Sequence, residues 1–144
     1  MLLILYTDGA CRGNPGPMAI GASIQDETGK ELATVSELFG DGTNNIAEYR
    51  AVLAGLEKAK SLGATEIEVR IDSKLAVEQL NGRYKVKNER LKLLHAQALE
   101  LLSQFKFTVV HVPREQNQRA DELANLAYIS RIGGKSCSIG PPAS

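Results

Sequence analysis

The feature that most constrains the fold of this chain is the order of its apolar segments along 144 residues. Three strand-like segments come first, at residues 2–8, 18–26 and 30–39. The second and third are joined by Asp26-Glu27-Thr28-Gly29, which is typical of a hairpin turn. Helical and strand-like segments then alternate to residue 131. This order predicts an antiparallel meander followed by right-handed helical crossovers, which place strands parallel.

Helical spacing of apolar residues and capping side chains locate the later elements. Helices are expected at residues 46–62, 73–80, 88–103 and 118–131, and strands at residues 66–71 and 107–112. Residues 43–45 supply capping side chains for the first helix, and Asn117 is expected to cap the last one. The chain is therefore expected to be an α/β protein, with helices packed on a mixed five-stranded sheet.

Length and composition indicate one domain. At 144 residues and 43% apolar content, the chain is long enough to bury one hydrophobic core. The domain is expected to span residues 1–131. The remaining residues, 132–144, are rich in Gly, Ser and Pro and are expected to form a flexible tail.

The chain carries no sign of export or of a membrane segment. Its first apolar run is too short for a signal peptide, and no run is long enough to cross a bilayer. Two cysteines, Cys11 and Cys137, are too few and too far apart to indicate a disulfide framework. We therefore expect a cytoplasmic protein that has no membrane contact, needs no obligatory protein partner and is monomeric.

The charge balance argues against a protein that binds nucleic acid by bulk electrostatics. Seventeen basic and seventeen acidic side chains give a formal net charge of zero. One local concentration of positive charge stands out, formed by Arg83, Lys85, Lys87, Arg90 and Lys92. Such a cluster taken alone is more often a solvated surface than a binding site.

Four acidic residues lie at positions that this topology can bring together. Asp8 is expected to end the first strand, Asp72 follows the fourth, and Asp121 lies in the first turn of the last helix. Glu48 is expected in the first turn of the first helix. Each of the last three is ordinary when taken alone, because acids are favoured near helix N-termini. Asp8 is less easily explained, since it follows an apolar strand and carboxylates are rarely buried without a partner.

Together the four carboxylates predict a metal site. Like charges that lie close together repel each other unless a cation neutralises them. An all-oxygen ligand set without Cys or His favours Mg²⁺ or Mn²⁺ over zinc. Two such ions roughly 4 Å apart can activate a water and stabilise the leaving oxygen when a phosphodiester is cleaved.

Four sequence segments carry a family resemblance. They are residues 6–17 (YTDGACRGNPGP), residues 43–48 (TNNIAE), Asp72-Ser73 and residues 119–124 (RADELA). In order and spacing these blocks resemble type 1 ribonuclease H over residues 2 to about 128. The resemblance implies a ribonuclease H-like fold with sheet order 3-2-1-4-5, an antiparallel second strand and helices on both faces. It implies an endonuclease that cuts the RNA strand of an RNA·DNA hybrid and leaves 5′-phosphate and 3′-hydroxyl ends.

The resemblance also implies roles for individual residues. Asp8, Glu48, Asp72 and Asp121 would hold two Mg²⁺ or Mn²⁺ ions when substrate is bound. The residues expected to contact the nucleic acid are Gly9, Cys11, Gly13, Asn14, Thr43, Asn44 and Asn45. The glycines also suit loop positions where a Cβ would clash and where backbone amides can approach a phosphate. The asparagines can act as turn and cap residues or hydrogen-bond ribose hydroxyls and base edges.

The chain departs from the best-known bacterial pattern in two places. Residues 82–87 leave no room for a long basic protrusion, so the chain resembles the protrusion-less branch found in archaea and some bacteria. The loop before Asp121 lacks the usual histidine. Arg114 is the candidate replacement there, with a surface arginine as the alternative interpretation. We expect His111 to be packed in its strand and His95 to lie on a helix surface.

Other functions remain as alternatives. A different nuclease of the same fold, such as a junction resolvase or a proofreading exonuclease, would use similar acids, but an exonuclease is expected to carry Asp-x-Glu where this chain has Asp8-Gly9-Ala10. A non-catalytic hybrid-binding module would not need all four acids. A phosphate-binding kinase of the sugar-kinase type would need a second lobe, for which the chain is too short.

Overall fold

The computed structural model describes residues 1–133, with side chains through residue 129. The strands are β1 (Leu2–Cys11), β2 (Gly16–Gln25), β3 (Glu31–Gly42), β4 (Glu66–Ile71) and β5 (Lys106–His111). The α-helices are α1 (Asn44–Ser61), α2 (Lys74–Leu80), α3 (Glu89–Leu102) and α4 (Gln118–Gly133). A short 3-10 turn, η1 (Arg114–Gln116), precedes α4. The expected flexible tail falls mostly on residues 134–144, which lie outside the described part.

The strands form one mixed sheet in the order β3-β2-β1-β4-β5. Strand β2 is antiparallel to both β1 and β3, whereas β1, β4 and β5 are parallel to one another. The sheet order and the antiparallel second strand that the sequence predicts are confirmed. The carboxyl ends of β1 and β4 consequently lie side by side at one edge of the sheet.

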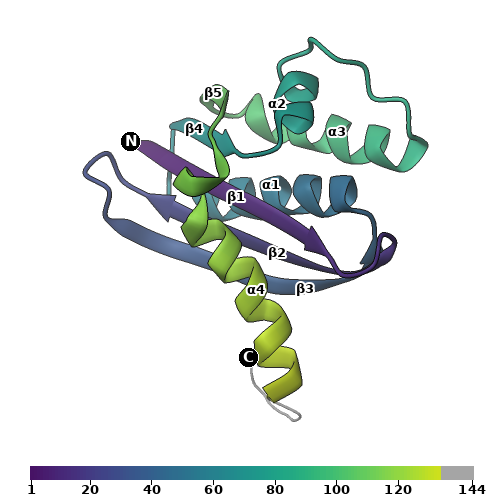
Figure 1. Ribbon diagram of the computed structural model, residues 1–144. Coiled ribbons are helices and arrows are strands. Elements are labelled where there is room, and N and C mark those ends of the chain that lie inside the picture. The colour runs from purple at the N-terminus through teal and green to yellow at the C-terminus, as the bar shows by residue number, and fades with distance from the viewer. Residues whose placement is uncertain (134–144) are drawn as a thin grey trace.

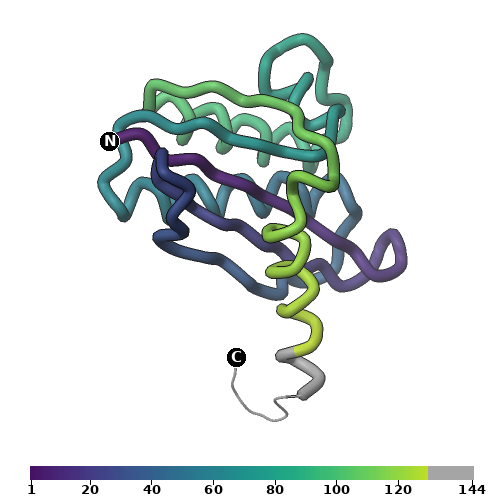
Figure 2. Tube along the Cα trace, turned by 60° about the vertical axis from the view of Figure 1, so that its left-hand side comes forward, coloured from purple at the N-terminus to yellow at the C-terminus, as the bar shows by residue number. Residues whose placement is uncertain are grey.

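Helices cover both faces of the sheet, as expected. Helix α1 packs against β1 and β2 on one face, and α3 packs against α1. Helix α4 crosses the other face over β1, β2 and β3, in front of the sheet in Figure 1. The turned view in Figure 2 shows α4 on the opposite side from the teal helices. None of the described helices is long and apolar enough to cross a membrane.

The core lies between the sheet and α1. Its largest fully buried side chains include Leu3 and Leu5 of β1, Leu56 of α1 and Ile71 of β4. Alternate β1 residues point into this layer, because side chains of a strand alternate between its two faces. A Cβ on Gly55 would lie 2.6 Å from a methyl carbon of Leu5, so α1 lies unusually close to β1.

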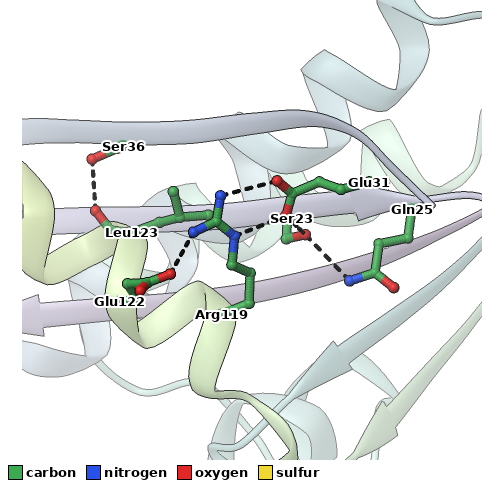
Figure 3. A network of polar contacts seen from close by, with 7 residues as sticks. All are labelled: Ser23, Gln25, Glu31, Ser36, Arg119, Glu122 and Leu123. Atoms are coloured by element: carbon green, nitrogen blue, oxygen red, sulfur yellow. Dashed lines mark hydrogen bonds and ion pairs between the residues drawn. The ribbon is translucent and has the colours of Figure 1, made fainter. Parts of the chain in front are cut away.

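Polar contacts fasten α4 to the hairpin of β2 and β3 (Figure 3). The Arg119 guanidinium donates to both carboxylate oxygens of Glu31, over 2.9 and 3.0 Å. The Ser23 hydroxyl donates to the same carboxylate over 2.8 Å. One turn further along α4, the Ser36 hydroxyl donates to the Leu123 carbonyl oxygen over 2.6 Å. These contacts join the first two turns of α4 to the sheet at the helix surface.

A buried polar network holds the short connection between α2 and α3. The Tyr49 hydroxyl of α1 donates to Oε1 of Gln79 over 2.8 Å. The Gln79 side-chain amide donates to the Lys85 carbonyl oxygen at 3.5 Å, and the backbone carbonyl oxygen of Gln79 lies 2.9 Å from Nε2 of His95. His95 was expected on a helix surface, but it is half-buried and joins this network. The prediction for His95 was therefore wrong, because sequence spacing does not show that α2 packs beside α3.

Two other expectations about strands are corrected. β1 does not end at Asp8 but runs on to Cys11, because the antiparallel pairing with β2 continues from Asp8 to Cys11 after the parallel pairing with β4 stops at Thr7. His111, expected to be packed, is exposed. It is the last residue of edge strand β5, beyond the packed Val109, and its side chain reaches solvent near Glu78 of α2.

Candidate active site

Three carboxylates from three elements meet beside the carboxyl ends of β1 and β4. One oxygen each from Asp8, Glu48 and Asp72 lies within 4.8 Å of the others. Asp8 and Glu48 are only 8% and 9% exposed, whereas Asp72 is partly open to solvent. Asp8 comes from β1, Glu48 from α1 and Asp72 from the residue after β4. The sequence predicted that these three would meet, and the structure places them together.

Glu48 reaches the sheet because α1 lies directly on Gly9. A Cβ on Gly9 would lie 2.2 Å from the carbonyl carbon of Ala47 and 2.4 Å from the Glu48 nitrogen, so only glycine permits this contact. The Gly9 backbone N–H donates to Oε1 of Glu48 over 2.9 Å. Gly9 thus lies in a strand rather than in the expected loop, and its amide is used within the protein. Glu48 lies in the second turn of α1, not the first, because the helix begins at Asn44.

Asp121 lies beside Asp8 from the opposite face of the sheet. It is exposed in the first turn of α4, as predicted, and its carboxyl group is close enough to that of Asp8 to raise the Asp8 pKa. A second glycine makes this possible, since Gly21 pairs with Asp8 across the sheet. A Cβ on Gly21 would lie 2.2 Å from the Ala120 carbonyl oxygen. The other three acids that the sequence singles out, Glu48, Asp72 and Asp121, therefore lie around Asp8.

The protein surroundings disfavour negative charge in this cluster. Burial and, after it, the neighbouring Glu48, Asp72 and Asp121 together raise the pKa of Asp8 to about 9. The pKa of Glu48 is raised to about 8, mainly by burial, although the Gly9 hydrogen bond and the charge of Arg114 oppose the rise. At neutral pH the cluster holds protons that a bound cation would displace.

The ligand set fits a hard divalent cation. Oxygen ligands at 2.0–2.1 Å in an octahedron lie about 3 Å apart when adjacent and about 4 Å apart when opposite. The 4.8 Å spread of the three carboxylates is close to this range, so small side-chain movements suffice to complete a site. No sulfur or imidazole takes part in this group of described residues. Asp8, Glu48 and Asp72 therefore suit Mg²⁺ or Mn²⁺. Asp121 lies beside Asp8 and can approach a cation that is bound there.

The segment between β5 and α4 contributes two further side chains. Arg114 in η1 is exposed, and its charge opposes the rise in the Glu48 pKa, so it lies within electrostatic range of the cluster. Asn117 is fully buried, and its side-chain amide donates to Oδ2 of Asp72 over 3.0 Å and to the Thr7 carbonyl oxygen over 2.8 Å. We expected Asn117 to cap α4 with its side chain, and that expectation was wrong. The signal available in the sequence was its position four residues before Asp121.

The candidate substrate contacts lie on a strip beside the cluster. The turn between β1 and β2 meets the start of α1, where Oδ1 of Asn14 accepts from the Asn44 backbone N–H over 3.1 Å. Thr43 caps α1 by accepting from the Ile46 N–H, and the side chains of Asn44 and Asn45 are exposed. The side-chain amides of Asn44 and Asn45 make no hydrogen bond to the described residues, so they are open to a ligand.

Cys11 and Gly13, two further members of the predicted contact set, shape the turn between β1 and β2. The Cys11 thiol lies 2.9 Å from the Gly42 carbonyl oxygen and 3.1 Å from that of Gly13. Cys11 therefore ties the turn to the end of β3 and is only partly accessible. Gly13 is exposed with a φ of 77°, a conformation that favours glycine. This turn presents backbone at the surface, as a phosphate-contacting loop requires.

Comparison with known proteins places this geometry in a family. The family model described as "Reverse transcriptase-like" matches residues 6–127. The crystal structure of RNase H1 from the archaeon Halobacterium salinarum superimposes with a TM-score of 0.87 at 42% identity, covering 90% of this chain and 98% of that one. The chain belongs to the type 1 ribonuclease H family.

A second ribonuclease H1 structure carries a ligand. LC11-RNase H1, solved in complex with an RNA/DNA hybrid, has a TM-score of 0.85 and 43% identity, over 90% of this chain and 99% of that one. A bifunctional protein of Mycobacterium tuberculosis is 47% identical over 143 residues, which is 98% of this chain but 39% of that protein. This ribonuclease H chain thus spans less than half the length of its mycobacterial relative.

The absence of a long basic protrusion in this ribonuclease H is confirmed. Only residues 81–88 connect α2 to α3. Part of the basic cluster is used within the protein, since Arg83 pairs with Glu78 and Arg90 donates to the Asp41 carbonyl oxygen. Lys85 and Lys87 make no ion pair with the described residues. The positive charge left for a ligand on this side is therefore small.

Proposed function

We propose that this chain is an endonuclease that hydrolyses the RNA strand of RNA·DNA hybrids with Mg²⁺ or Mn²⁺ at Asp8, Glu48, Asp72 and Asp121. The observation that carries the proposal is the meeting of three carboxylate oxygens within 4.8 Å, with Asp121 beside Asp8, in a ribonuclease H fold. The binding of a hybrid by LC11-RNase H1, a relative of 43% identity, supports the choice of substrate.

The acidic residues of the chain have two roles in the proposed reaction, metal binding and placement of the substrate. The four carboxylates hold the cations and set where the scissile phosphate can lie. Two bound divalent cations would supply activation of a water and stabilisation of the leaving oxygen, which gives 5′-phosphate and 3′-hydroxyl products. Burial of Asp8 and Glu48 strengthens every charge interaction at the site, because little water screens it.

Substrate contact falls to the strip formed by the first turn and the start of α1. The exposed amides of Asn44 and Asn45 can donate to and accept from ribose 2′-hydroxyls and base edges. Gly9, Cys11, Gly13, Asn14 and Thr43 complete this proposed strip. Within it, Gly9, Cys11, Asn14 and Thr43 shape the backbone, since their polar groups bond within the protein.

We propose Arg114 as the cation that replaces the missing loop histidine. Its charge already acts on Glu48, and it lies exposed on the three-residue turn η1, where its guanidinium can contact the scissile phosphate or the product.

We further propose that the enzyme works as a cytoplasmic monomer on hybrids. Gel filtration of the purified chain, with and without hybrid, measures the state of assembly.

The proposed function is tested by cleavage of a labelled substrate panel. An RNA·DNA hybrid is expected to be cut in Mg²⁺ or Mn²⁺, while duplex DNA stays intact and a chelator stops the reaction. Asp72→Asn is expected to reduce cleavage by at least about 10³-fold, because it removes a charged ligand. Glu27→Gln, on an exposed hairpin turn, is the matched charge-removing control and should cleave normally. Tight hybrid binding by the wild type without cleavage would instead identify a non-catalytic module.

A further inference from the structure

Asn117 is a buried polar residue within an exposed segment. Its relative exposure is 0%, whereas η1 before it and Gln118 after it are exposed. Asparagine is rarely found fully buried unless its amide is hydrogen-bonded. The segment therefore turns inward at this one residue, directly beside the carboxylate cluster.

The Asn117 amide joins two parts of the site. One N–H of Nδ2 donates to the carbonyl oxygen of Thr7, the residue before Asp8, over 2.8 Å. The other donates to Oδ2 of Asp72 over 3.0 Å. A carbonyl oxygen and a carboxylate oxygen only accept, so the amide can have just this orientation. One planar group thus sets the spacing between the Asp72 carboxylate and the β1 backbone next to Asp8.

The buried Asn117 side chain does not give the highest possible stability of the fold. Oδ1 of Asn117 is buried and has no hydrogen-bond partner among the described residues, and the same holds for the Thr7 hydroxyl. A buried acceptor without a partner costs about 1–3 kcal/mol. Asparagine at this place therefore retains an unfavourable oxygen in order to present two N–H donors, which is typical of functional sites.

We propose that Asn117 is a positioning residue, which orients the Asp72 carboxylate so that its free oxygen faces Asp8 and Glu48 as a ligand for a divalent cation. The proposal rests on the proposed metal site. Asn117 itself does not touch the metal or the substrate in this scheme. Without the amide, Asp72 at the end of β4 is free to rotate toward solvent, because the N–H from Asn117 is its only hydrogen bond to a described residue.

The test measures Mn²⁺ binding to the substrate-free protein by electron paramagnetic resonance or calorimetry. Asn117→Ala is expected to weaken Mn²⁺ binding by about tenfold or more, the range seen when a ligand loses its orienting hydrogen bond. Asn81→Ala is the matched control, because its amide also donates to a strand carbonyl, that of Val109 at 3.0 Å, but contacts no carboxylate. Unchanged Mn²⁺ affinity in Asn117→Ala would overturn the proposal.

A second background separates positioning from general support of the fold. In Asp72→Ala, the same Asn117→Ala change is expected to alter Mn²⁺ affinity by less than about twofold, because the group it orients is gone. An equal loss in both backgrounds would mean that Asn117 acts through the backbone at Thr7, and the proposal would fail. If Asn117→Ala does not fold, as judged by circular dichroism, Asn117→Ser carries the same comparison.

The proposed function and this inference fail in different ways. If the wild type binds Mn²⁺ but leaves hybrids uncut, the nuclease proposal is wrong while the Asn117 comparison still applies. If the wild type cuts hybrids and the Asn117→Ala and wild-type Mn²⁺ affinities coincide, only the positioning role is wrong.

Discussion

The two flanks of the carboxylate cluster are built by different means. On the β1–β2 flank, α1 lies on Gly9 and α4 lies on Gly21, so main chain touches main chain on both faces of the sheet. On the β4–β5 flank, the strands are six residues long and the segment after them is held to the cluster by the side chain of Asn117. The backbone contacts of the first flank leave the helices almost no freedom to move relative to the sheet. On the second flank, the position of the segment after the strands depends on individual side chains.

The two flanks therefore position different residues of the site in different ways. The glycine flank fixes where Asp8 and Glu48 lie, because no side-chain rotation can alter a backbone contact. The β4–β5 flank carries the partly exposed Asp72 and the exposed Arg114, whose positions can adjust to a ligand. The site thus combines Asp8 and Glu48, which are held rigidly, with Asp72 and Arg114, which can adjust. Substitutions on the rigid flank should mainly change stability, and those on the adjustable flank should mainly change cleavage.

The largest effect is expected from Gly21→Ala on the rigid flank. The new methyl group would lie 2.2 Å from the Ala120 carbonyl oxygen, so α4 must shift. We expect a loss of about 3 kcal/mol in the free energy of unfolding, measured by urea denaturation. Gly40→Ala is the control, since nothing lies within 4 Å of its added Cβ. Equal stability of the two variants would show that the glycine flank is not rigid.

The next effect is a fall in stability of the metal-free protein as pH rises. Folding raises the pKa values of Asp8 and Glu48 to about 9 and about 8, from 3.8 and 4.5. Between about pH 4 and pH 9 the folded state holds protons that the unfolded state has lost, so raising the pH favours unfolding.

Thermal denaturation in chelator is expected to show this as a drop in Tm of roughly 5 °C or more between about pH 5 and pH 9. Mg²⁺ should restore much of the lost stability at the upper end, since it binds the charged carboxylates of the folded state. Asp8→Asn should flatten the dependence. A Tm that rises between these pH values in the wild-type protein would contradict the raised pKa values of Asp8 and Glu48.

A smaller effect is expected from Arg114→Ala on the adjustable flank. Removing its positive charge should lower the rate of hybrid cleavage roughly tenfold, less than a buried donor would, because Arg114 is exposed. Stability should be unchanged. Arg114→Lys should recover part of the rate, and Lys106→Ala on β5 serves as an exposed control. A full rate in Arg114→Ala would leave Arg114 as a plain surface residue.

The smallest effect is expected from Arg119→Ala, which removes the ion pairs of Figure 3. Arg119 and Glu31 are 42% and 31% exposed, so the loss of stability should be about 1 kcal/mol. Lys92→Ala, which breaks an exposed pair with Glu89, should cost less. Hybrid cleavage by Arg119→Ala should stay close to normal, because the Gly21 contact sets the position of α4. A large loss of cleavage would show that side chains position Asp121 as well.

Much of this architecture could be predicted from the sequence because it depends on local patterns. Hairpin residues, Thr43 as a cap and the spacing of apolar residues indicate the elements, and the order of elements limits the sheet topology. The approach of Asp8, Glu48 and Asp72 followed from their places at the ends of those elements. Asp8 itself was misplaced at the end of its strand, since β1 has two neighbours of different length.

The remaining features depend on which surfaces face each other. The exposure of His111 follows from its place at the end of edge strand β5, and the burial of His95 follows from the packing of α2 beside α3. The use of Asn117 to hold Asp72 requires a contact between residues 45 positions apart. Local patterns do not contain such distances, and here they indicated a helix cap instead.

The network around Gln79 has a consequence for protein engineering. Tyr49, His95 and the Lys85 carbonyl oxygen hold both ends of the connection between α2 and α3, while residues 81–85 and 87–88 are exposed. Extra residues placed next to the exposed Lys87, which makes no hydrogen bond to the described residues, would add mainly loop entropy, about 0.6 kcal/mol for each doubling of length. The chain therefore offers an insertion point on this connection, where a basic segment could be grafted without disturbing the core.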